Sequence, residues 1–475
     1  MRSSTPKVLH RIGGRSLLGH LLAAVADAGA AEVAVVVGHG RELVAPHVAD
    51  CSPSARTVVQ AEQLGTGRAT AVGLEAIEAE QGTVLVVMGD TPLLAPATLR
   101  DLATEHRSRG HVVTVLAARL ADPTGYGRLV RGGNGQLVAS VEQRDASAGQ
   151  LEIDEVNTGI YAFDLGWLRT ALPLLGSDNA QGEAYLPDVI ALARSNGLGV
   201  GAGSVRDTLQ TEGVNDRVQL AALGAELNRR TLVAGMRAGA TVVDPATTWV
   251  DVTVALGRDV CLLPGVQLHG STAVADGATI GPDCTLTDVQ VGAGATVVRT
   301  HGVDAVVGDG ATVGPFAYLR PGTVLADSAR IGTFVEAKNS HVGTGAKVPH
   351  LSYVGDASVG EGSNIGAGTI FANYDGVAKH RTKVGRHCHT GADNVFVAPV
   401  EIGDGAATGA GTIVRRDVPP GALAVSTGPQ RHIEGWVAQK RAGSAADQAA
   451  AAATHDEGSV GHTGYAGLDG EGTSQ

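Results

Sequence analysis

A single carboxylate follows the clearest strand-like run in the first half of the chain. The run covers Thr83 to Met88, and Gly89 and Asp90 come directly after it. An aspartate at the carboxyl end of a strand can hold Mg²⁺, because this hard cation prefers oxygen ligands and works beside phosphates. An aspartate here can also form a turn or cap a helix. The motif alone leaves both interpretations open.

A glycine-rich connection offers a possible anion site. It runs from Gln60 to Gly67, between a strand candidate and a helix-like stretch, and contains Gly65 and Thr66. Glycines permit close approach of the backbone to a ligand, and a helix N-terminus favours anions. A tight connection between strand and helix would need the same glycines.

Several weaker positions in the first half share this polar or glycine-rich character. Lys7 precedes a probable helix and could equally be a solvated surface charge. The others lie at expected loop ends: residues 125–128, Glu142 and residues 156–159. Each is weak by itself, but their order and spacing together are informative.

Two histidine motifs lie in the second half. His350 comes two residues after Val348, outside the expected bore, where an exposed turn histidine is the simpler interpretation. The run His387-Cys388-His389 contains metal-ligating residue types. In the six-residue register described below, Cys388 points inward and its neighbours point outward. We therefore expect structural roles for these three residues.

Strand-like and helix-like stretches alternate along residues 1–211 and must position the candidate site residues of the first half. Strand candidates cover residues 32–37, 57–60, 83–88 and 112–117, with helix-like stretches at 16–28 and 67–79. This alternation predicts an α/β, Rossmann-like, mainly parallel sheet that binds ligands at the carboxyl ends of its strands. Residues 215–238 are predicted to form one helix, within a linker at 212–240, with Leu220, Leu223 and Leu227 on one face.

The second half is organised by a six-residue period. Aliphatic residues fall on every sixth position at Leu256, Leu262, Leu268, Val274, Ile280 and Leu286. The same register continues at Val307, Val313, Leu319, Leu325 and Ile331, and again at Val384, Thr390, Phe396, Ile402, Thr408 and Val414. This period fits short strands and turns coiling into a β-helix, not an α-helix or a hairpin. We place this all-β domain at residues 241–440.

Interruptions of the period mark places where the coil projects residues. The period breaks between Phe371 and Val384, where residues 372–383 insert Asn373-Tyr374-Asp375-Gly376, and it slips by one residue between Val354 and Val359. A coil that projects loops only here presents residues to a ligand or to a neighbouring subunit.

Composition limits the partners and the compartment. The net charge of −12 argues against nucleic-acid or membrane partners, so any anionic substrate needs local positive charge. The four cysteines lack CxxC spacing, and no apolar run or leader is evident, which favours a cytoplasmic protein. Residues 441–475 are rich in Ala, Gly and Ser and are predicted to be disordered.

Taken together, the sites of the first half resemble those of sugar-phosphate nucleotidyltransferases. With the hexads and the run Lys347 to Tyr353, the chain to about residue 440 resembles the bifunctional enzymes that make UDP-N-acetylglucosamine. The resemblance implies acetylation of glucosamine 1-phosphate from acetyl-CoA in the β-helix. It also implies uridylation of N-acetylglucosamine 1-phosphate from UTP, with Mg²⁺, in the first domain. A left-handed coil and a homotrimer with shared sites are implied as well; the period itself shows neither.

The same resemblance assigns roles to individual residues. Contacts to the nucleotide sugar are implied for Lys7, Gln60, Gly65, Thr66, Gly89, Asp90, Gly127, Glu142, Asn157 and Asn215, of which Asp90 and Asn215 would hold Mg²⁺. His350 would be the general base, oriented by Glu336. The sugar phosphate would bind Arg320, Lys338, Tyr353 and Asn364. Acetyl-CoA would contact Ala367, Asn373, Tyr374, Ala392 and Ala410, with Ala392 standing where the family commonly has Ser.

One departure from the family lies at the start. The family begins with a strand and the loop Leu-Ala-Ala-Gly-x-Gly-Thr-Arg-Met, and Met1 corresponds to the last residue of that motif. Without that strand, loop and arginine, we expect a poorly folded first domain with weak uridylyl transfer, and we expect a misassigned start codon. In-frame upstream codons for the motif would confirm this, and a stop codon just before Met1 would contradict it.

Two alternatives to a bifunctional enzyme remain open at this point. One is an acetyltransferase alone, and the other is a non-catalytic regulatory or scaffold subunit. The set formed by His350, Asn373 and Tyr374 argues against the scaffold, which needs no such residues.

Overall fold

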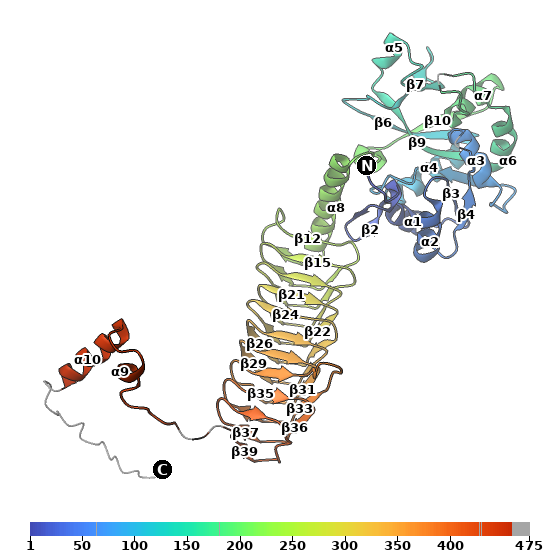
Figure 1. The fold of residues 1–475 in the computed structure, drawn as a ribbon. Coiled ribbons are helices and arrows are strands. Elements are labelled where there is room, and N and C mark those ends of the chain that lie inside the picture. Colours follow the sequence, from blue (N-terminus) through green and yellow to red (C-terminus); the bar gives the residue numbers. More distant parts are fainter. Residues whose placement is uncertain (63, 180, 427, 429, 458–475) are drawn as a thin grey trace. The chain divides into compact units, whose positions relative to one another are not determined.

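The computed structural model describes residues 1–62, 64–179, 181–426, 428 and 430–457 (Figure 1). The chain divides into two units, Met1–Ala424 and Val425–Gln475. No helix in the part of the chain that the structure describes has the length and apolar character needed to cross a membrane.

The first domain contains a six-stranded mixed sheet. Its strands are β5 (Thr83–Val86), β6 (Val113–Arg119), β7 (Gly127–Arg131), β8 (Leu137–Val141), β9 (Glu155–Asp164) and β10 (Val200–Ser204). β6 and β10 are parallel, whereas β9 runs antiparallel to β5, β6 and β7. The prediction of a mainly parallel sheet is therefore wrong. It failed because residues 156–159 were interpreted as a loop end, although they lie within the long strand β9, which pairs with three others.

A second sheet, of two strands, shares helix α1 (Leu17–Ala28) with the first sheet. β3 (Ala34–Val37) and β4 (Arg56–Val59) are parallel. Helix α1 packs on both sheets: Leu21 joins the cluster around Leu85, whereas Leu22 joins the cluster around Val37. Ser16 caps this helix by accepting a hydrogen bond from the Gly19 amide at 2.8 Å. Across the described residues the two sheets share no strand pair.

The other helices of the domain are mostly short and lie on its sheets. They are α2 (Arg41–Cys51), α3 (Thr66–Leu74), α4 (Pro96–Arg109), α5 (Ala148–Leu151), α6 (Leu165–Ala171) and α7 (Val189–Ser195). Single 3₁₀ turns lie at η1 (Lys7–Leu9), η2 (Leu172–Leu174), η3 (Leu186–Asp188) and η4 (Thr208–Thr211).

The predicted linker helix is α8 (Arg217–Arg237), which begins after the N-cap Asp216. A small hairpin of β1 (Arg11–Ile12) and β2 (Arg15–Ser16) packs against it, with Ile12 in one apolar cluster with Leu223. The carbonyl of Gly13 at the hairpin tip accepts a hydrogen bond from Val252 at 3.1 Å. The hairpin therefore ties the first domain to the start of the coil.

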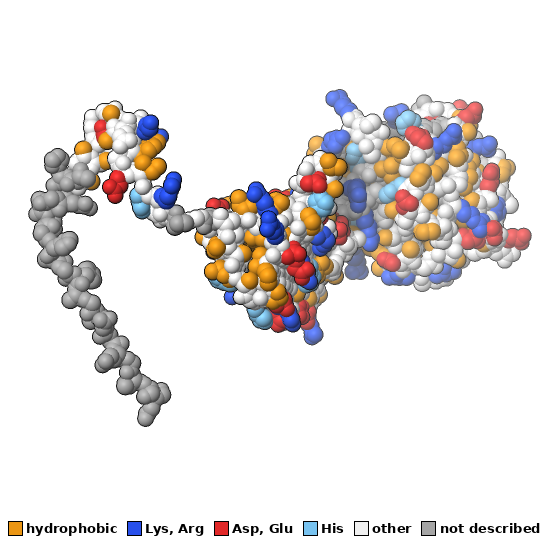
Figure 2. Space-filling model, turned by 60° about the horizontal axis from the view of Figure 1, so that its bottom comes forward, with side chains coloured by type: hydrophobic (Ala, Val, Ile, Leu, Met, Phe, Trp, Pro, Cys, Tyr) orange, Lys and Arg blue, Asp and Glu red, His pale blue; other side chains and the backbone are white. Residues whose placement is uncertain are grey.

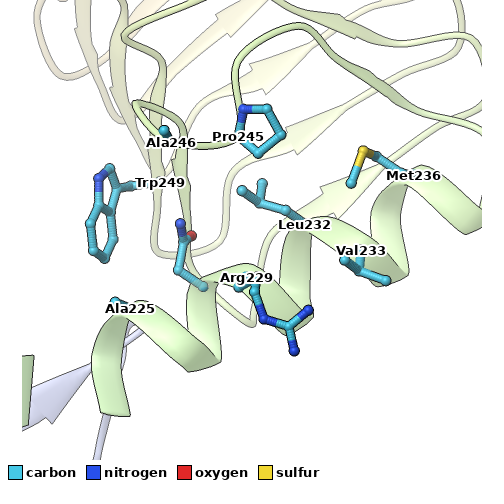
Figure 3. Close-up of a pocket in the computed structure, with 9 residues that line it drawn as sticks. Ala225, Arg229, Leu232, Val233, Met236, Pro245, Ala246 and Trp249 are labelled. Atoms are coloured by element: carbon cyan, nitrogen blue, oxygen red, sulfur yellow. The ribbon is translucent and has the colours of Figure 1, made fainter. Parts of the chain in front are cut away.

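A pocket of about 290 Å³ lies between α8 and the first coil (Figure 3). It is lined by Ala225, Asn228, Arg229, Leu232, Val233, Met236, Pro245, Ala246 and Trp249. None of the predicted site residues lines it. Asn228 is buried and bonds to the first coil, donating to the Thr248 carbonyl at 2.8 Å and accepting from the Val250 amide at 2.9 Å.

The second domain is a parallel β-helix whose strands stack into long sheets (Figure 1). The ten-stranded sheet contains β12 (Trp249–Val250), β15 (Gln267–His269), β18 (Thr285–Thr287), β21 (Thr300–Val303), β24 (Ala317–Leu319), β27 (Glu336–Lys338), β30 (Tyr353–Gly355), β32 (Ile370–Ala372), β35 (Val395–Val397) and β38 (Ile413–Val414). The nine-stranded sheet contains β13 (Ala255–Leu256), β16 (Ala273–Val274), β19 (Gln290–Val291), β22 (Ala305–Val307), β25 (Thr323–Leu325), β28 (His341–Val342), β31 (Ala357–Val359), β33 (Thr382–Val384) and β36 (Val400–Ile402).

The third side of the coil is divided between two sheets. The seven-stranded one contains β11 (Thr241–Val242), β14 (Cys261–Leu262), β17 (Thr279–Ile280), β20 (Thr296–Val297), β23 (Thr312–Val313), β26 (Arg330–Thr333) and β29 (Lys347–His350). The three-stranded one contains β34 (His389–Thr390), β37 (Ala407–Thr408) and β39 (Leu423–Ala424). Isolated bridges through Asn364 connect Lys347 to His389 across the gap.

The bore is filled as the hexads predict. Leu262, Leu268, Ile280 and Leu319 have no exposed surface, and Phe371 packs edge-on against Phe396 at 5.0 Å between ring centroids. Leu256, in the outermost coils, is only partly buried. The insertion between Phe371 and Val384 forms the predicted projecting loop, between β32 and β33.

The unit after Ala424 differs from our expectation. The last strand of the coil ends at Ala424, before the boundary at residue 440. Residues expected to be disordered form α10 (Ala445–Glu457), which follows the short α9 (Trp436–Lys440). The Ala-rich composition that we interpreted as disorder also gives the highest intrinsic helix propensity. The rest of that predicted tail, residues 458–475, lies outside the described residues.

Candidate active sites

Three predicted residues of the first domain meet at one point. The Lys7 ammonium donates to Asp90 Oδ2 at 2.5 Å and to Asn215 Oδ1 at 3.3 Å. Asp90 follows β5, Lys7 lies in η1, and Asn215 directly precedes the N-cap of α8. Gly213 packs against this carboxylate, where an added Cβ would come within 3.1 Å of Oδ2. Residues far apart in sequence thus place two oxygens around one cation.

The glycine-rich connection has a structural explanation. Gly65 adopts φ +101°, and a Cβ there would come within 2.6 Å of the Ala184 carbonyl oxygen. A Cβ at Gly67 would approach the same oxygen to 2.9 Å. Thr66 accepts a hydrogen bond from the Leu186 amide at 3.1 Å, and Gln60 donates to the Gly65 carbonyl at 3.4 Å. Packing against residues 184–186 therefore requires these glycines with or without a ligand.

A third group of predicted residues gathers where β7, β8 and β9 meet. Gly127 pairs with Asn157 across the sheet, and a Cβ on Gly127 would come within 3.2 Å of Glu142 Oε1. The Asn157 amide donates to Ser140 at 3.1 Å and to Tyr161 at 2.6 Å. Gly89 lies apart from this group, against Val8.

The Glu142 carboxyl lies in an electrostatically unfavourable position. Burial raises its pKa, and the nearby Asp145 and Asp188 carboxylates raise it further. Asp188 has a raised pKa for the same reasons, burial first and then Asp145. Asp188 was missed from the sequence, where it carries only the signal of a residue just before a helix. A site that disfavours carboxylate charge favours hydrogen-bonding partners such as sugar hydroxyls over anions.

In the β-helix, predicted sugar-phosphate residues lie on consecutive strands of the ten-stranded sheet. Glu336 pairs with Tyr353 across β27 and β30, and the Arg320 guanidinium donates to Glu336 Oε1 at 2.8 Å. Glu336 is therefore engaged by Arg320. Within the described residues it makes no hydrogen bond to His350, so the proposed orienting contact is not present.

The second cation of the site is held by a buried carboxylate. Lys338 Nζ donates to Asp356 Oδ2 at 3.3 Å. Asn373, at the base of the projecting loop, donates to the same oxygen and to the Tyr353 hydroxyl, the latter at 3.4 Å. Burial opposes ionisation of Asp356, but hydrogen bonds from Asn339, Asn373 and Lys338 outweigh it and lower its pKa.

Lys379 is a further cation that the sequence analysis missed. Its side chain lies beside Lys338, and its backbone forms an isolated antiparallel bridge with Tyr374 across the loop. The hydrogen bond with Lys379 and the Asp356 carboxylate raise the pKa of Lys338, whereas Lys338 lowers the pKa of Lys379. No local motif could have identified Lys379, because only folding of the loop brings it to Lys338.

His350 and three predicted acetyl-CoA contacts occupy one corner of successive coils. The His350 carbonyl accepts from the Gly368 amide at 3.2 Å, the Ala367 carbonyl from Asp393 at 2.6 Å, and the Ala392 carbonyl from Gly411 at 2.9 Å. His350, Ala367, Ala392 and Ala410 therefore form one column, called here the alanine corner. The His350 side chain and those of Ala392 and Ala410 are exposed.

The remaining predicted residues lie beside this corner or in the loop. Asn364 bridges the strands on either side of it, and Tyr374 in the loop is exposed with its hydroxyl donating to the Gly376 carbonyl at 2.7 Å. Cys388 is buried, donating to the Gly403 carbonyl at 3.1 Å, while His387 and His389 are exposed. The run His387-Cys388-His389 therefore has the inward and outward orientations that we expected.

Comparisons with known proteins agree with both domains. The family model of the MobA-like NTP transferase domain matches residues 1–151. The chain is 55% identical over 457 residues to the bifunctional protein GlmU of Corynebacterium jeikeium, covering 95% of this chain and 93% of that protein. Its counterparts in Mycolicibacterium gilvum and Kineococcus radiotolerans are 57% and 56% identical, each covering 95% of this chain and 92% of the relative.

Proposed function

Because this chain belongs to the family of the bifunctional protein GlmU, we propose that the residues gathered above perform the two transfers of that family at two separate sites. The protein is an enzyme with glucosamine-1-phosphate N-acetyltransferase and UDP-N-acetylglucosamine diphosphorylase activities, and its coil is a left-handed β-helix. It supplies UDP-N-acetylglucosamine for peptidoglycan. A scaffold without activity is not favoured.

The uridylyl transfer is proposed to occur around Lys7. N-acetylglucosamine 1-phosphate attacks the α-phosphorus of UTP, pyrophosphate leaves, and no covalent enzyme intermediate is needed. Lys7 lies close enough to Asp90 and Asn215 to share their ligands, and its ammonium can neutralise phosphate charge. Gly127, Glu142 and Asn157 are proposed to bind the sugar. The nucleotide is proposed to contact Gln60, Gly65, Thr66 and Gly89.

The donor set at this point suits Mg²⁺. Asp90 and Asn215 offer a carboxylate and an amide oxygen, both turned toward the Lys7 ammonium, and such oxygens are the ligands that Mg²⁺ prefers. These two residues would hold the ion, which would neutralise triphosphate charge. Lys7 would then exchange its contacts with them for the phosphates.

The acetyl transfer is proposed to occur at the alanine corner. His350 takes the proton from the amine of glucosamine 1-phosphate as that amine attacks the thioester carbon of acetyl-CoA, and coenzyme A leaves as the thiol. Arg320 and Lys338, with Tyr353 and Asn364, bind the sugar phosphate, and Lys379 adds a third cation. Ala367, Asn373, Tyr374, Ala392 and Ala410 contact acetyl-CoA. The column of His350 and the three alanines is the observation that supports this proposal. In this column the predicted base for the amine of glucosamine 1-phosphate lies next to the predicted contacts to acetyl-CoA.

Each activity supplies the control for the other. His350→Ala should abolish thiol release from acetyl-CoA in the presence of glucosamine 1-phosphate while uridylyl transfer continues. Lys7→Met should do the reverse. His389→Ala is the matched control, because this exposed histidine lies on the same side of the coil. Full acetyltransferase activity in His350→Ala would exclude the proposed base.

We further propose a homotrimer with shared acetyltransferase sites. Apolar residues protrude at one corner of the coil: Phe316 is 52%, Phe334 58% and Leu351 61% exposed, and the two phenylalanine rings stack at 5.3 Å. Figure 2 shows hydrophobic side chains on the coil surface. Phe334→Asp should give monomers in sedimentation experiments and remove acetyl transfer, whereas Val306→Asp on the nine-stranded sheet should do neither. A fully active monomer would contradict the proposal.

We also propose that the protein is cytoplasmic. The four cysteines are free in the structure, with Cys284 and Cys388 buried, as suits a reducing compartment. Fractionation of producing cells would test it.

A further inference from the structure

Asp356 is a buried carboxylate that contacts no substrate in the proposed function. Its residue is 5% exposed and adopts φ +49° at a corner of the coil, next to β31. Oδ1 accepts from Asn339 at 2.7 Å, and Oδ2 accepts from both Lys338 and Asn373. The donors lie on two other segments, residues 338–339 and Asn373, so one carboxylate joins both segments to its own corner of the coil.

Two of these hydrogen-bond donors are proposed to bind different substrates. Lys338 lies on β27 and is proposed to bind the sugar phosphate, whereas Asn373 begins the projecting loop and is proposed to contact acetyl-CoA. The loop returns through His380, whose amide donates to the Asn373 carbonyl at 2.8 Å, and the Thr382 amide donates to the Asp356 carbonyl at 3.3 Å. Asp356 therefore anchors both ends of the loop.

The charge of Asp356 also bears on the cations around it. Lys338 and Lys379 lie side by side, with Arg320 and Tyr353 near them, and Asp356 attracts both lysines. Two adjacent ammonium groups repel each other, so a neighbouring carboxylate helps to keep both protonated. Without that carboxylate, the pair would lose a proton at lower pH and bind a phosphate more weakly.

We propose that Asp356 is a positioning residue that fixes the sugar-phosphate lysine and the acetyl-CoA loop together, so that the two substrate sites are built on one carboxylate. Asp356 touches neither substrate; it acts through Lys338 and Asn373. This inference rests on the acetyltransferase site proposed above and adds a coupling between its two halves.

Two substitutions separate the charge of Asp356 from its hydrogen bonds. Asp356→Ala removes every acceptor. Asp356→Asn can keep the contacts, because the Asn339 amide can turn over to accept from the new amide, so it removes mainly the charge. Asp304→Asn is the matched control. Asp304 lies at the same corner with φ +45°, and the described contacts include none for its side chain.

The readouts are the KM for glucosamine 1-phosphate, the KM for acetyl-CoA and the pH profile of acetyl transfer, with uridylyl transfer of the same sample reporting folding. Asp356→Ala should raise both KM values about tenfold, as loss of a charge-assisted hydrogen bond to each partner implies. Asp356→Asn should raise the KM for the sugar phosphate more than that for acetyl-CoA. It should also move the alkaline limb of the profile to lower pH, which a merely structural change would not do.

Other outcomes overturn the inference. If both KM values of Asp356→Ala stay within twofold of wild type, or only one changes, Asp356 does not join the two sites. If Asp356→Ala fails to fold, an unshifted alkaline limb in Asp356→Asn overturns the inference by itself. Failure of the proposed function would be seen separately, as activity retained by His350→Ala.

Discussion

Replacement of Asn228 tests how the coil is closed at its first turn. β12 is the terminal strand of the ten-stranded sheet, so its outer edge has backbone groups that no further strand can bond. Asn228 of α8 covers that edge, donating to the Thr248 carbonyl and accepting from the Val250 amide. Asn228→Ala leaves both backbone groups without partners. We expect the first coil to open more readily.

The magnitude follows from the two lost hydrogen bonds. A buried polar group left unpaired costs about 1–3 kcal/mol, so two groups would cost about 2–6 kcal/mol. The pocket of about 290 Å³ that Asn228 lines can admit water to these groups, which places the cost at the lower end. We therefore expect about 2–3 kcal/mol, which corresponds to roughly 30- to 150-fold faster local opening.

Hydrogen exchange is the suitable assay, because a chain with two domains does not unfold in one step. The probes are the amides of Trp249 and Asp251, which bond to Val266 and Leu268 and keep their partners in the variant. Asn196→Ala is the control, since Asn196 also bonds to a backbone carbonyl, at 2.9 Å, but is exposed. Exchange within threefold of wild type at both probes would refute the reasoning.

Three further perturbations test other parts of the fold. Burial raises the pKa of Glu142, so the ionised carboxylate destabilises the folded domain at pH values above 4.5, the ordinary pKa of the group. Glu142→Gln should therefore raise the melting temperature at pH 8 and leave it unchanged below pH 4.5. The hydrogen bond from Arg229 lowers the pKa of Glu226 to about 2, so the ionised carboxylate stabilises the fold above pH 4.5 and this stability should fall as the pH drops toward 2. Glu226→Gln should remove this pH dependence from acid-unfolding curves. Gly314 has φ +96° and a Cβ there would come within 1.9 Å of the Val298 carbonyl oxygen, so Gly314→Ala should lower stability by at least about 2 kcal/mol in denaturant unfolding.

The coil was predictable because its signal is repeated. Each hexad buries one aliphatic side chain, as at Leu268 and Ile280, and many repeats in one register leave no other period that fits. The first domain offered one example of each element. Glu155–Asp164 has the length of a strand, but its Asn, Thr and Gly suggested a loop, and only its pairing with three other strands identifies it.

The sequence predicted some of the residues that the structure brings together, but not their individual contacts. The meeting of Lys7, Asp90 and Asn215 could be expected from the resemblance. The pairing of Glu336 with Arg320 could not, because spacing does not show which of two neighbouring groups a carboxylate selects. Lys379 and Asp356 were missed because their contacts form only after the loop has folded against the coil.

The alanine corner shows why small residues matter below His350. Neighbouring coils of a parallel sheet lie about 4.8 Å apart, so the four residues His350, Ala367, Ala392 and Ala410 span roughly 14 Å. The methyl side chains along that length fill little space beside His350, so we expect the extended arm of acetyl-CoA to take this path in the proposed transfer. A large side chain at Ala392 should obstruct that arm and leave the proposed sugar-phosphate contacts Lys338 and Tyr353, on the ten-stranded sheet, unchanged. Ala392→Phe should therefore raise the KM for acetyl-CoA and leave that for glucosamine 1-phosphate within twofold, and an equal rise in both would contradict this path.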